Sequence, residues 1–218
     1  WGVTTYDLFT GFIEDWKPSW LATDAGLLPI MTLTCSDALR FLSRFEITDA
    51  VGYAAELSGT RIGNVLDDMG WPAGLRDLDA GQSTMQASGA LTQDNGMQHL
   101  QLVQRSEQGI LFVDGAGNVV FQDRHARLKA PYTTSQATFG DDPGESAYKI
   151  IDPSFPDEFI YNDVTIQRTG GAAQNAADAS SKTSYGPGYS SDTSLLMSTD
   201  TDALAQAQYR VSRYKDPA

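Results

Sequence analysis

The alternation of apolar and polar positions predicts two strands in the first part of the chain. Residues 4–16 (TTYDLFTGFIEDW) are rich in β-branched and aromatic types, which are typical of a strand. Residues 29–35 (PIMTLTC) alternate between apolar and polar, as a second strand should. Between them, Pro18 and the Ala25-Gly26 pair predict a loop.

Apolar residues that recur every three or four positions predict four helices further along the chain. Gly70 and Gly109 are typical C-terminal caps and end the second and third of them. A Trp71-Pro72 pair follows the second helix and prevents its continuation. The four expected starts are Ser36-Asp37, the region of Thr60, Asp94-Asn95, and Thr199 or Asp200.

The clearest local pattern is a β-hairpin. The apolar runs 110–114 (ILFVD) and 118–123 (NVVFQD) flank a Gly115-Ala116-Gly117 turn. Residues 159–168 (FIYNDVTIQR) alternate and predict one more strand.

Two segments lack such patterns. Residues 73–93 contain several glycines and predict a loop, and residues 169–194 contain no Leu, Ile, Val, Phe or Met. The second segment is therefore expected to be a long polar surface arm. The order of elements predicts an α+β fold, not the alternating βαβ pattern of a nucleotide-binding sheet.

Composition narrows the class of protein. The chain has 15 Lys and Arg against 28 Asp and Glu, a net charge of −13, and 41% hydrophobic residues. That apolar content indicates a globular chain, and the negative charge argues against broad binding to nucleic acid or anionic membranes. No apolar run approaches the roughly 20 residues needed to span a bilayer. The chain opens at Trp1 without an initiator Met, so we expect an excerpt from a longer polypeptide.

The single cysteine, Cys35, cannot form an internal disulfide, which suits synthesis in a reducing cytoplasm. With two histidines in the chain, a structural zinc site is not expected. A thiol dyad of Cys35 with His99 or His125 is one alternative, but a lone cysteine is more often a small buried hydrophobe.

Other candidate chemistry also has a simpler interpretation. Gly115-x-Gly117 leads into a strand and lacks a lysine, so it indicates a hairpin turn instead of a phosphate loop. The cluster Asp123-Arg124-His125-Ala126-Arg127 could hold a general base if Asp123 oriented His125. Adjacent residues of a strand point to opposite faces, so this pair is poorly placed for that role. We therefore expect no catalytic, cofactor-binding or metal-binding residues.

The acidic pairs are also weighed as sites. A glycosidase would need two carboxylates at catalytic spacing, and solvated surface is the simpler interpretation of the pairs present. Two Asp-x-Asp pairs lack the full twelve-residue calcium loop. The acidic candidates are Asp67-Asp68, Asp141-Asp142 with Glu145, Asp77-x-Asp79 and Asp200-x-Asp202.

Four tryptophans form the last candidate group, as a sugar-stacking platform. Three of them, Trp1, Trp16 and Trp20, lie near the first strand and its loop, and the fourth is Trp71. Packing or a subunit interface is the favoured interpretation, because aromatic residues are enriched at interfaces.

In the order of its motifs, the chain resembles the minor tail proteins of siphophages that infect actinobacteria. More distantly it is similar to the baseplate hub and late-control D group of tail proteins. The resemblance covers nearly the whole chain. It rests on LFTGFIEDW, TLTCSDALRFL, the Gly-Trp-Pro at 70–72, ILFVDGAGNVVFQDRHAR, SQATFGD at 135–141, FIYNDVTIQR, and a closing helix that ends RYKDP. Lys182 before Tyr185-Gly186 departs from the family pattern around a strand expected at 180–190.

The resemblance implies tail-hub-like β-barrel elements with a helical insertion. It divides the chain into partial barrel strands at 1–35, the insertion at 36–109, hairpin and strands at 110–168, and polar arm and helix at 169–218. It also implies a structural, non-catalytic virion protein at the tail tip, assembled in the bacterial cytoplasm as a homotrimer without cofactors. The implied partners are tail-tube, distal tail and tape-measure proteins.

The resemblance also gives the charge a role. Hub rings surround a channel that DNA passes without specific binding, and three copies would carry roughly −39 charges that repel phosphate. Two other functions stay open: a tail-associated hydrolase that degrades the cell wall, and a carbohydrate-binding receptor module used in host attachment.

Overall fold

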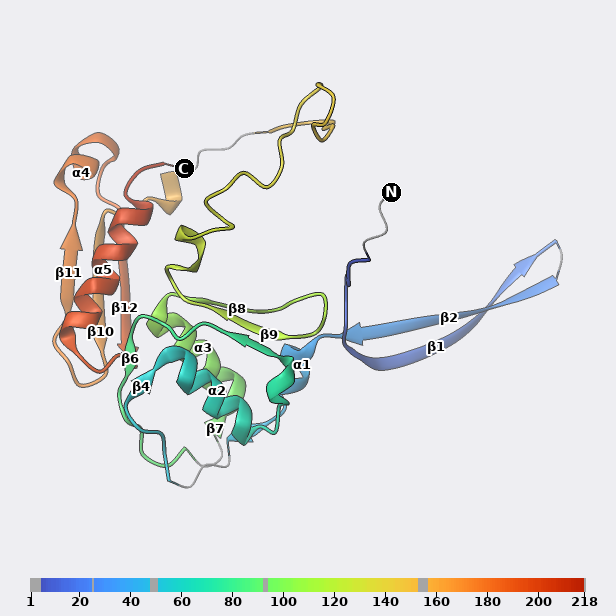
Figure 1. The fold of residues 1–218 in the computed structure, drawn as a ribbon, viewed down its shortest axis with the longest axis horizontal. Coiled ribbons are helices and arrows are strands. Elements are labelled where there is room, and N and C mark those ends of the chain that lie inside the picture. The colour runs from blue at the N-terminus through green and yellow to red at the C-terminus, as the bar shows by residue number, and fades with distance from the viewer. Residues whose placement is uncertain (1–4, 25, 48–50, 92–93, 153–156, 218) are drawn as a thin grey trace.

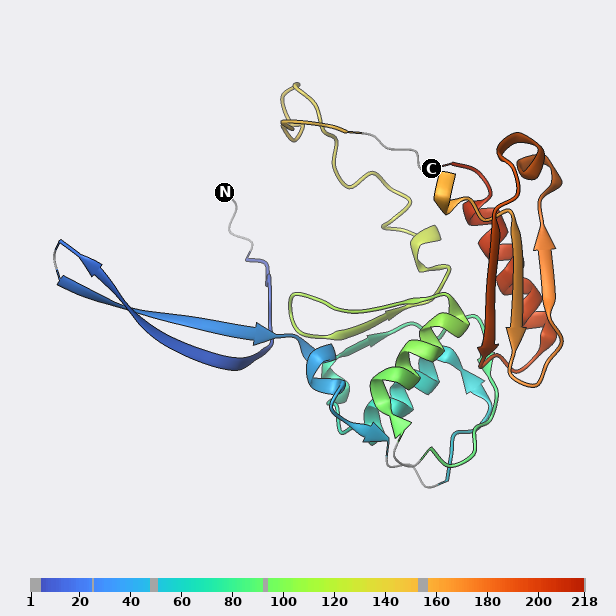
Figure 2. The ribbon, with the colours of Figure 1, turned by 180° about the vertical axis from the view of Figure 1, so that it is seen from behind.

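The structure is a computed structural model that describes residues 5–24, 26–47, 51–91, 94–152 and 157–217. It consists of a central helical body, a second unit of sheet and helix, and two projections (Figures 1 and 2). One projection is the long N-terminal hairpin, and the other is the loop that follows β9. The described strands form five separate sheets, and none of them closes into a barrel.

The helical body contains α1 (Ala38–Leu42), α2 (Ser58–Asp68) and α3 (Gly96–Glu107). The expected caps are confirmed at Asp37, which accepts from the Arg40 amide, and at Asn95, which accepts from the Gln98 amide. The core under these helices includes the fully buried Leu42, Ile62, Leu66, Leu100 and Val103.

The glycine-turn hairpin is confirmed and covers this body. It consists of β8 (Ile110–Val113) and β9 (Val119–Gln122), with Phe121 buried in the core. β5 (Arg76–Leu78) follows the 3₁₀ turn η1 (Ala73–Leu75) and pairs parallel with β9.

Two short pairings complete the body. They join β3 (Glu46–Ile47) to β7 (Asp94–Asn95) and β4 (Glu56–Leu57) to β6 (Thr84–Met85). The expected loop over 73–93 is therefore partly wrong. Two strands of two or three residues are too short to leave a periodic pattern in the sequence.

The second unit is a three-stranded sheet with α5 (Asp200–Tyr214) on one face (Figures 1 and 2). β10 (Asp163–Arg168) lies in the middle, antiparallel to β11 (Gln174–Ala177) and parallel to β12 (Tyr189–Leu195). The expected cap of the last helix is confirmed, because Thr199 accepts from the Asp202 amide. Val164 and Ile166 face the helix and are completely buried.

The predicted polar arm over 169–194 is wrong. The segment forms β11, α4 (Ala179–Tyr185) and β12. Its edge strands need few large apolar residues, because β10 supplies backbone partners and α5 supplies the apolar cover. Asn162 fixes the connection by donating to Ser181 Oγ at 2.9 Å and Gly186 O at 2.8 Å, and by accepting from the Gly188 amide.

The predicted first strand is also misplaced. β1 runs from Phe12 to Thr23 and β2 from Gly26 to Ser36, so Pro18 lies inside a strand and not in a loop. Both strands of a two-stranded ribbon are edge strands, where proline is tolerated. The connections η2 (Ala126–Leu128) and η3 (Asp157–Phe159) are single 3₁₀ turns. The division into four units at residues 35, 109 and 168 stays a prediction.

Candidate assembly surface

The hairpin of β1 and β2, called here the hairpin arm, projects away from the helical body (Figures 1 and 2). Its strands pair antiparallel from Phe12↔Ser36 to Thr23↔Gly26, with a register shift between Ile13 and Asp15. Every residue of the two strands except Asp15 and Ser36 is exposed. The arm is therefore held by its own ladder and by its root, not by a core.

The register sorts the side chains of the arm onto two faces. Directly opposed residues share a face, and alternate pairs share the same face. One face is apolar along four successive pairs, and we call it the apolar face. Its members are Trp16↔Leu33, Pro18↔Met31, Trp20↔Pro29 and Ala22↔Leu27. The opposite face begins with the polar pairs Asp15↔Thr34 and Lys17↔Thr32. Toward the tip it continues with Ser19↔Ile30 and the apolar pair Leu21↔Leu28.

The tryptophans dominate the apolar face. Trp16 is 61% exposed and Trp20 is 68% exposed. At 150–250 Å² for a fully buried aromatic side chain, the two rings alone leave roughly 200–320 Å² in water. With Leu27, Met31 and Leu33 beside them, the face reaches the size of apolar patches that mark interaction sites.

The root of the arm is fixed to the helical body by stacking and charge. The Phe12 ring stacks on Phe41 of α1 with 4.6 Å between centroids, and it meets Trp71 edge-on at 6.4 Å. Glu14 Oε1 accepts from Arg44 Nη2 at 3.0 Å. These contacts fix the direction in which the arm leaves the body.

The glycine turn of β8 and β9 has a packing role. Thr10 Oγ1 donates to Gly115 O at 3.0 Å, and a Cβ on Gly115 would lie 2.0 Å from Asp7 O. Gly117 has φ +91° and would place a Cβ 2.9 Å from Thr10. Both glycines therefore let the segment before the arm approach the turn closely.

The structure separates the predicted tryptophan group. Trp16 and Trp20 share the apolar face, whereas Trp71 is buried and donates from Nε1 to Leu75 O at 3.1 Å. Trp1 lies outside the described residues. Two exposed tryptophan rings thus share one face of the arm, and Trp71 belongs to the core.

The thiol dyad is not assembled in the described part of the chain. Cys35 lies exposed on β2, which also makes the expected buried cysteine wrong. His99 packs beside Tyr53, and His125 packs beside Tyr209, with 5.8 Å between centroids in each pair. Burial, reinforced by Arg61, lowers the pKa of His99 to about 4, so this imidazole is neutral near pH 7.

The paired carboxylates mostly have structural partners. Asp67 pairs with Arg76 at 2.8 Å, Asp68 accepts from Tyr53 Oη at 2.6 Å, and Asp200 pairs with Arg168 at 2.6 Å.

Two further acids also serve backbone or side-chain donors. Asp79 accepts from the Asp123 amide at 3.0 Å, and Asp123 accepts from the His125 amide at 2.8 Å. Among the described residues, no three His, Cys, Asp or Glu side chains gather in a way that could hold a metal ion. Within the same residues, no helix is long and apolar enough to cross a membrane.

Three solved structures share this fold, and all are tail proteins. The 43 kDa tail protein of prophage MuSo2 from Shewanella oneidensis has 17% identity and a TM-score of 0.59 over 95% of this chain and 60% of that chain. The tail protein from Neisseria meningitidis MC58 has 12% identity and a TM-score of 0.60 over 95% and 61%. Prophage tail protein gp18 from Listeria monocytogenes EGD-e has 7% identity and a TM-score of 0.51 over 93% and 60%.

These likenesses concern the fold, because the identities are low. The chain spans about three fifths of the length of these tail proteins. No protein-family model matches the sequence. A search of curated proteins finds no match. The comparisons therefore show a fold that the chain shares with these tail proteins.

Proposed function

We propose that the chain is a non-catalytic structural protein of a phage tail tip or hub, which joins the tail tube to the distal host-attachment apparatus. The observation that carries the proposal is the hairpin arm, whose apolar face is exposed along four successive residue pairs. Such an arm exposes a large apolar surface and has no hydrophobic core of its own, and exposed apolar surface of this size is typical of interaction sites.

The proposed occupant of the apolar face is a second copy of the same chain, in a homotrimer. The two Trp rings supply a sizeable part of the roughly 800 Å² per partner that a stable interface buries. Both strands of the arm also have free outer edges, which pair readily with another chain. In this proposal the arms and their edges form a barrel-like hub wall between copies.

The acidic surface of the assembly would line the channel that DNA passes without specific binding. Like charge repels phosphate and prevents adsorption of the passing duplex. An electrostatic map of the assembled trimer should therefore show a negative lumen, and a neutral or basic lumen would contradict this part of the proposal. Tail-tube, distal tail and tape-measure proteins are the further proposed neighbours, and assembly takes place in the bacterial cytoplasm.

Light scattering coupled to size exclusion tests the oligomer. Three copies of 23.6 kDa should elute as a species of about 71 kDa. A stable 23.6 kDa monomer at all concentrations would contradict the trimer. For the non-catalytic role, a suspension of bacterial cell walls should keep its turbidity when the chain is added, whereas a cell-wall hydrolase would lower it.

One observation favours a second candidate function, a carbohydrate-binding module for host attachment. Trp16 and Trp20 lie on one face of the arm and are exposed, as sugar-stacking rings must be. Sedimentation with cell-wall polysaccharide separates the two functions. A receptor module co-sediments with the polysaccharide and loses this binding in Trp20→Ala, whereas an assembly surface leaves the chain in the supernatant.

A further inference from the structure

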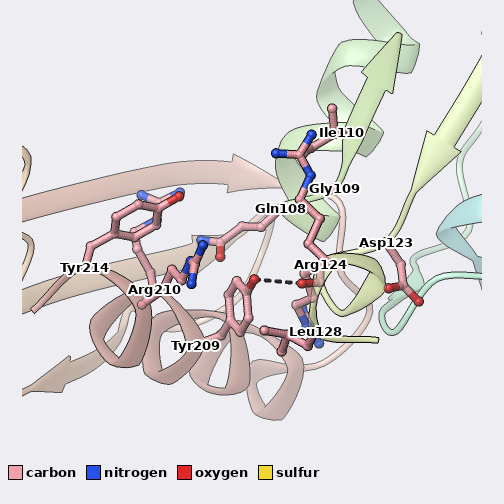
Figure 3. A pocket seen from close by; sticks show the side chains of 11 residues that line it. Gln108, Gly109, Ile110, Asp123, Arg124, Leu128, Tyr209, Arg210 and Tyr214 are labelled. Atoms are coloured by element: carbon pink, nitrogen blue, oxygen red, sulfur yellow. Dashed lines mark hydrogen bonds between the residues drawn. The ribbon is translucent and has the colours of Figure 1, made fainter. Parts of the chain in front are cut away.

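A second surface of the molecule carries chemistry that the hairpin arm does not use. A pocket of about 270 Å³ lies between the C-terminal half of α5, the turn after β9 and the start of β8. Figure 3 shows side chains from α5 facing those of the β9 turn across it. We call it the arginine pocket, because four arginines line it: Arg124, Arg127, Arg210 and Arg213.

The local charge of the pocket is opposite to that of the whole chain. Asp123 is the one carboxylate in its lining, and its oxygens already accept from Gln82 Nε2 and the His125 amide. Arg127 and Arg213 are exposed and form no ion pair or side-chain hydrogen bond with the described residues. Two guanidinium groups are thus free for a ligand in a chain of net charge −13.

The walls of the pocket are held in place before any ligand arrives. Arg210 Nη1 donates to Ser190 Oγ at 3.0 Å, and Arg210 Nη2 lies 3.4 Å from Asp192, which also pairs with Arg105. With its amide oxygen turned toward Arg210, Gln108 accepts from Nε at 2.7 Å. Asp192 pairs with both Arg105 and Arg210, so this wall of the pocket keeps a net positive charge.

Tyr209 on α5 lines the pocket together with the four arginines. Its hydroxyl donates to Arg124 O at 2.7 Å, as the dashed line in Figure 3 shows. Burial raises the pKa of Tyr209, and the nearby Arg213 and Arg124 oppose that rise. The hydroxyl therefore stays protonated near pH 7 and adds no negative charge to the pocket.

A loop elsewhere in the chain has the complementary chemistry. Residues 138–146, the acidic loop, close on themselves through Ser146 N donating to Thr138 O at 2.8 Å and Gly140 N donating to Ser146 O at 3.2 Å. Asp141 and Asp142 are exposed on this loop and form no ion pair with the described residues. Phe139 on the same loop is 63% exposed.

We propose that the arginine pocket binds the carboxylates of the acidic loop of a second copy of this chain. Asp141 and Asp142 would meet Arg127 and Arg213, since guanidinium groups bind carboxylates through paired hydrogen bonds. The exposed Leu128 beside the pocket offers an apolar contact for Phe139. Among the described residues, no hydrogen bond or ion pair joins the loop to the pocket of its own chain.

A loop and a pocket on one chain form a heterologous contact, which repeats around a ring and closes when the rotation permits. The inference rests on the proposed function in one respect, because it takes the second copy as the partner. The arginine pocket and the hairpin arm are separate surfaces, so each can be tested while the other is intact.

The first test measures binding of a fluorescent peptide with the sequence of residues 136–147 to the full 218-residue chain. The peptide should bind, and binding should weaken as salt rises. The Arg127→Gln/Arg213→Gln chain should bind roughly tenfold more weakly, from about threefold for each exposed ion pair. The matched Arg127→Lys/Arg213→Lys chain keeps the charge and should retain most of the affinity.

Two controls make the binding test specific. A peptide with Asp141→Asn, Asp142→Asn and Glu145→Gln should not bind, because it has no carboxylate for the arginines. Inorganic phosphate at the same concentration should not displace the acidic peptide. Equal binding of both peptides, equal binding to the Gln and wild-type chains, or displacement by phosphate would overturn the proposal.

A mixing experiment tests the second copy as the partner. A chain with Arg127→Glu/Arg213→Glu and a chain with Asp141→Arg/Asp142→Arg should each self-associate less than wild type. Their mixture should recover part of the association, because two of the three contacts in a mixed ring of three pair opposite charges. Circular dichroism checks that both variants are folded. If the peptide binds but the mixture does not recover, the second copy is not the occupant. A wild-type chain that forms trimers but does not bind the peptide would overturn this inference and leave the proposed function standing.

Discussion

Removing Trp20 from the hairpin arm separates assembly from folding. The side chain is 68% exposed, so Trp20→Ala removes roughly 100–170 Å² of apolar surface from a proposed interface. At about 25 cal/mol per Å², the interface loses roughly 2.5–4 kcal/mol of association free energy. That loss corresponds to roughly 60- to 700-fold weaker association at each interface.

The same substitution should leave the folded chain almost unchanged. Trp20 lies on an exposed ribbon outside both hydrophobic cores. Substitutions at such sites usually change the free energy of unfolding by less than about 0.5 kcal/mol. The assay is sedimentation velocity over a range of protein concentrations, with thermal unfolding measured on the same samples.

Thr32→Ala is the matched control, because Thr32 lies on the opposite face of the arm and is also exposed. It should leave association within about twofold of wild type, as expected for an exposed polar side chain outside the contact. Unchanged association of Trp20→Ala, or an equal loss in Thr32→Ala, would refute the reasoning that the apolar face is the contact surface.

Three further predictions concern the stability of the helical body and the second unit. Ile166→Ala in the completely buried face of β10 should lower the free energy of unfolding by about 2–5 kcal/mol in urea titration, and a loss under 1 kcal/mol would contradict the assigned core. Glu107→Gln should lower the free energy of unfolding by about 3 kcal/mol in the same assay. The buried carboxylate accepts from the Ser83 amide at 2.8 Å and from Ser58 Oγ at 3.0 Å, and its Oε1 lies 3.9 Å from Arg124 Nε, which would lose its counter-charge. An unchanged midpoint would argue against this buried charge network. Folding lowers the pKa of His99 from 6.5 to about 4, so the unfolded chain binds the proton more readily than the folded chain. This contribution to the free energy of unfolding is fully present above pH 6.5 and declines by up to about 3 kcal/mol as the pH falls toward 4. His99→Asn should flatten this pH dependence of the free energy of unfolding.

Local chemistry made parts of the fold predictable. Two apolar runs around Gly115-x-Gly117 allow little except a hairpin, and Asp37, Asn95 and Thr199 cap helices as their side chains favour. These features depend on neighbours in the sequence. They could therefore be found without knowledge of the tertiary contacts.

The errors came where a distant partner decides the structure. Gln174–Ala177 forms a strand because β10 offers its edge, although the segment itself has no large apolar residue. Pro18 is tolerated in β1 because that strand has a free outer edge.

The two candidate surfaces also depend on contacts between residues that are distant in the sequence. Trp16, Pro18 and Trp20 alternate along the sequence and lie on the apolar face. The other half of that face comes from β2, so it can be identified only when the register between the two strands is known. The arginine pocket brings residues 124 and 127 together with 210 and 213, which are more than 80 positions apart, and no sequence pattern marks that meeting.

Immunogold labelling of purified virions of a phage that encodes this chain tests the central claim most directly. Polyclonal antibodies against the whole chain, which also recognise surfaces outside the proposed contacts, would label particles under the electron microscope. The account predicts gold at the distal end of the tail, in particles that also contain the chain by mass spectrometry. Gold along the whole tail, or a chain absent from purified particles, would contradict a structural role at the tail tip.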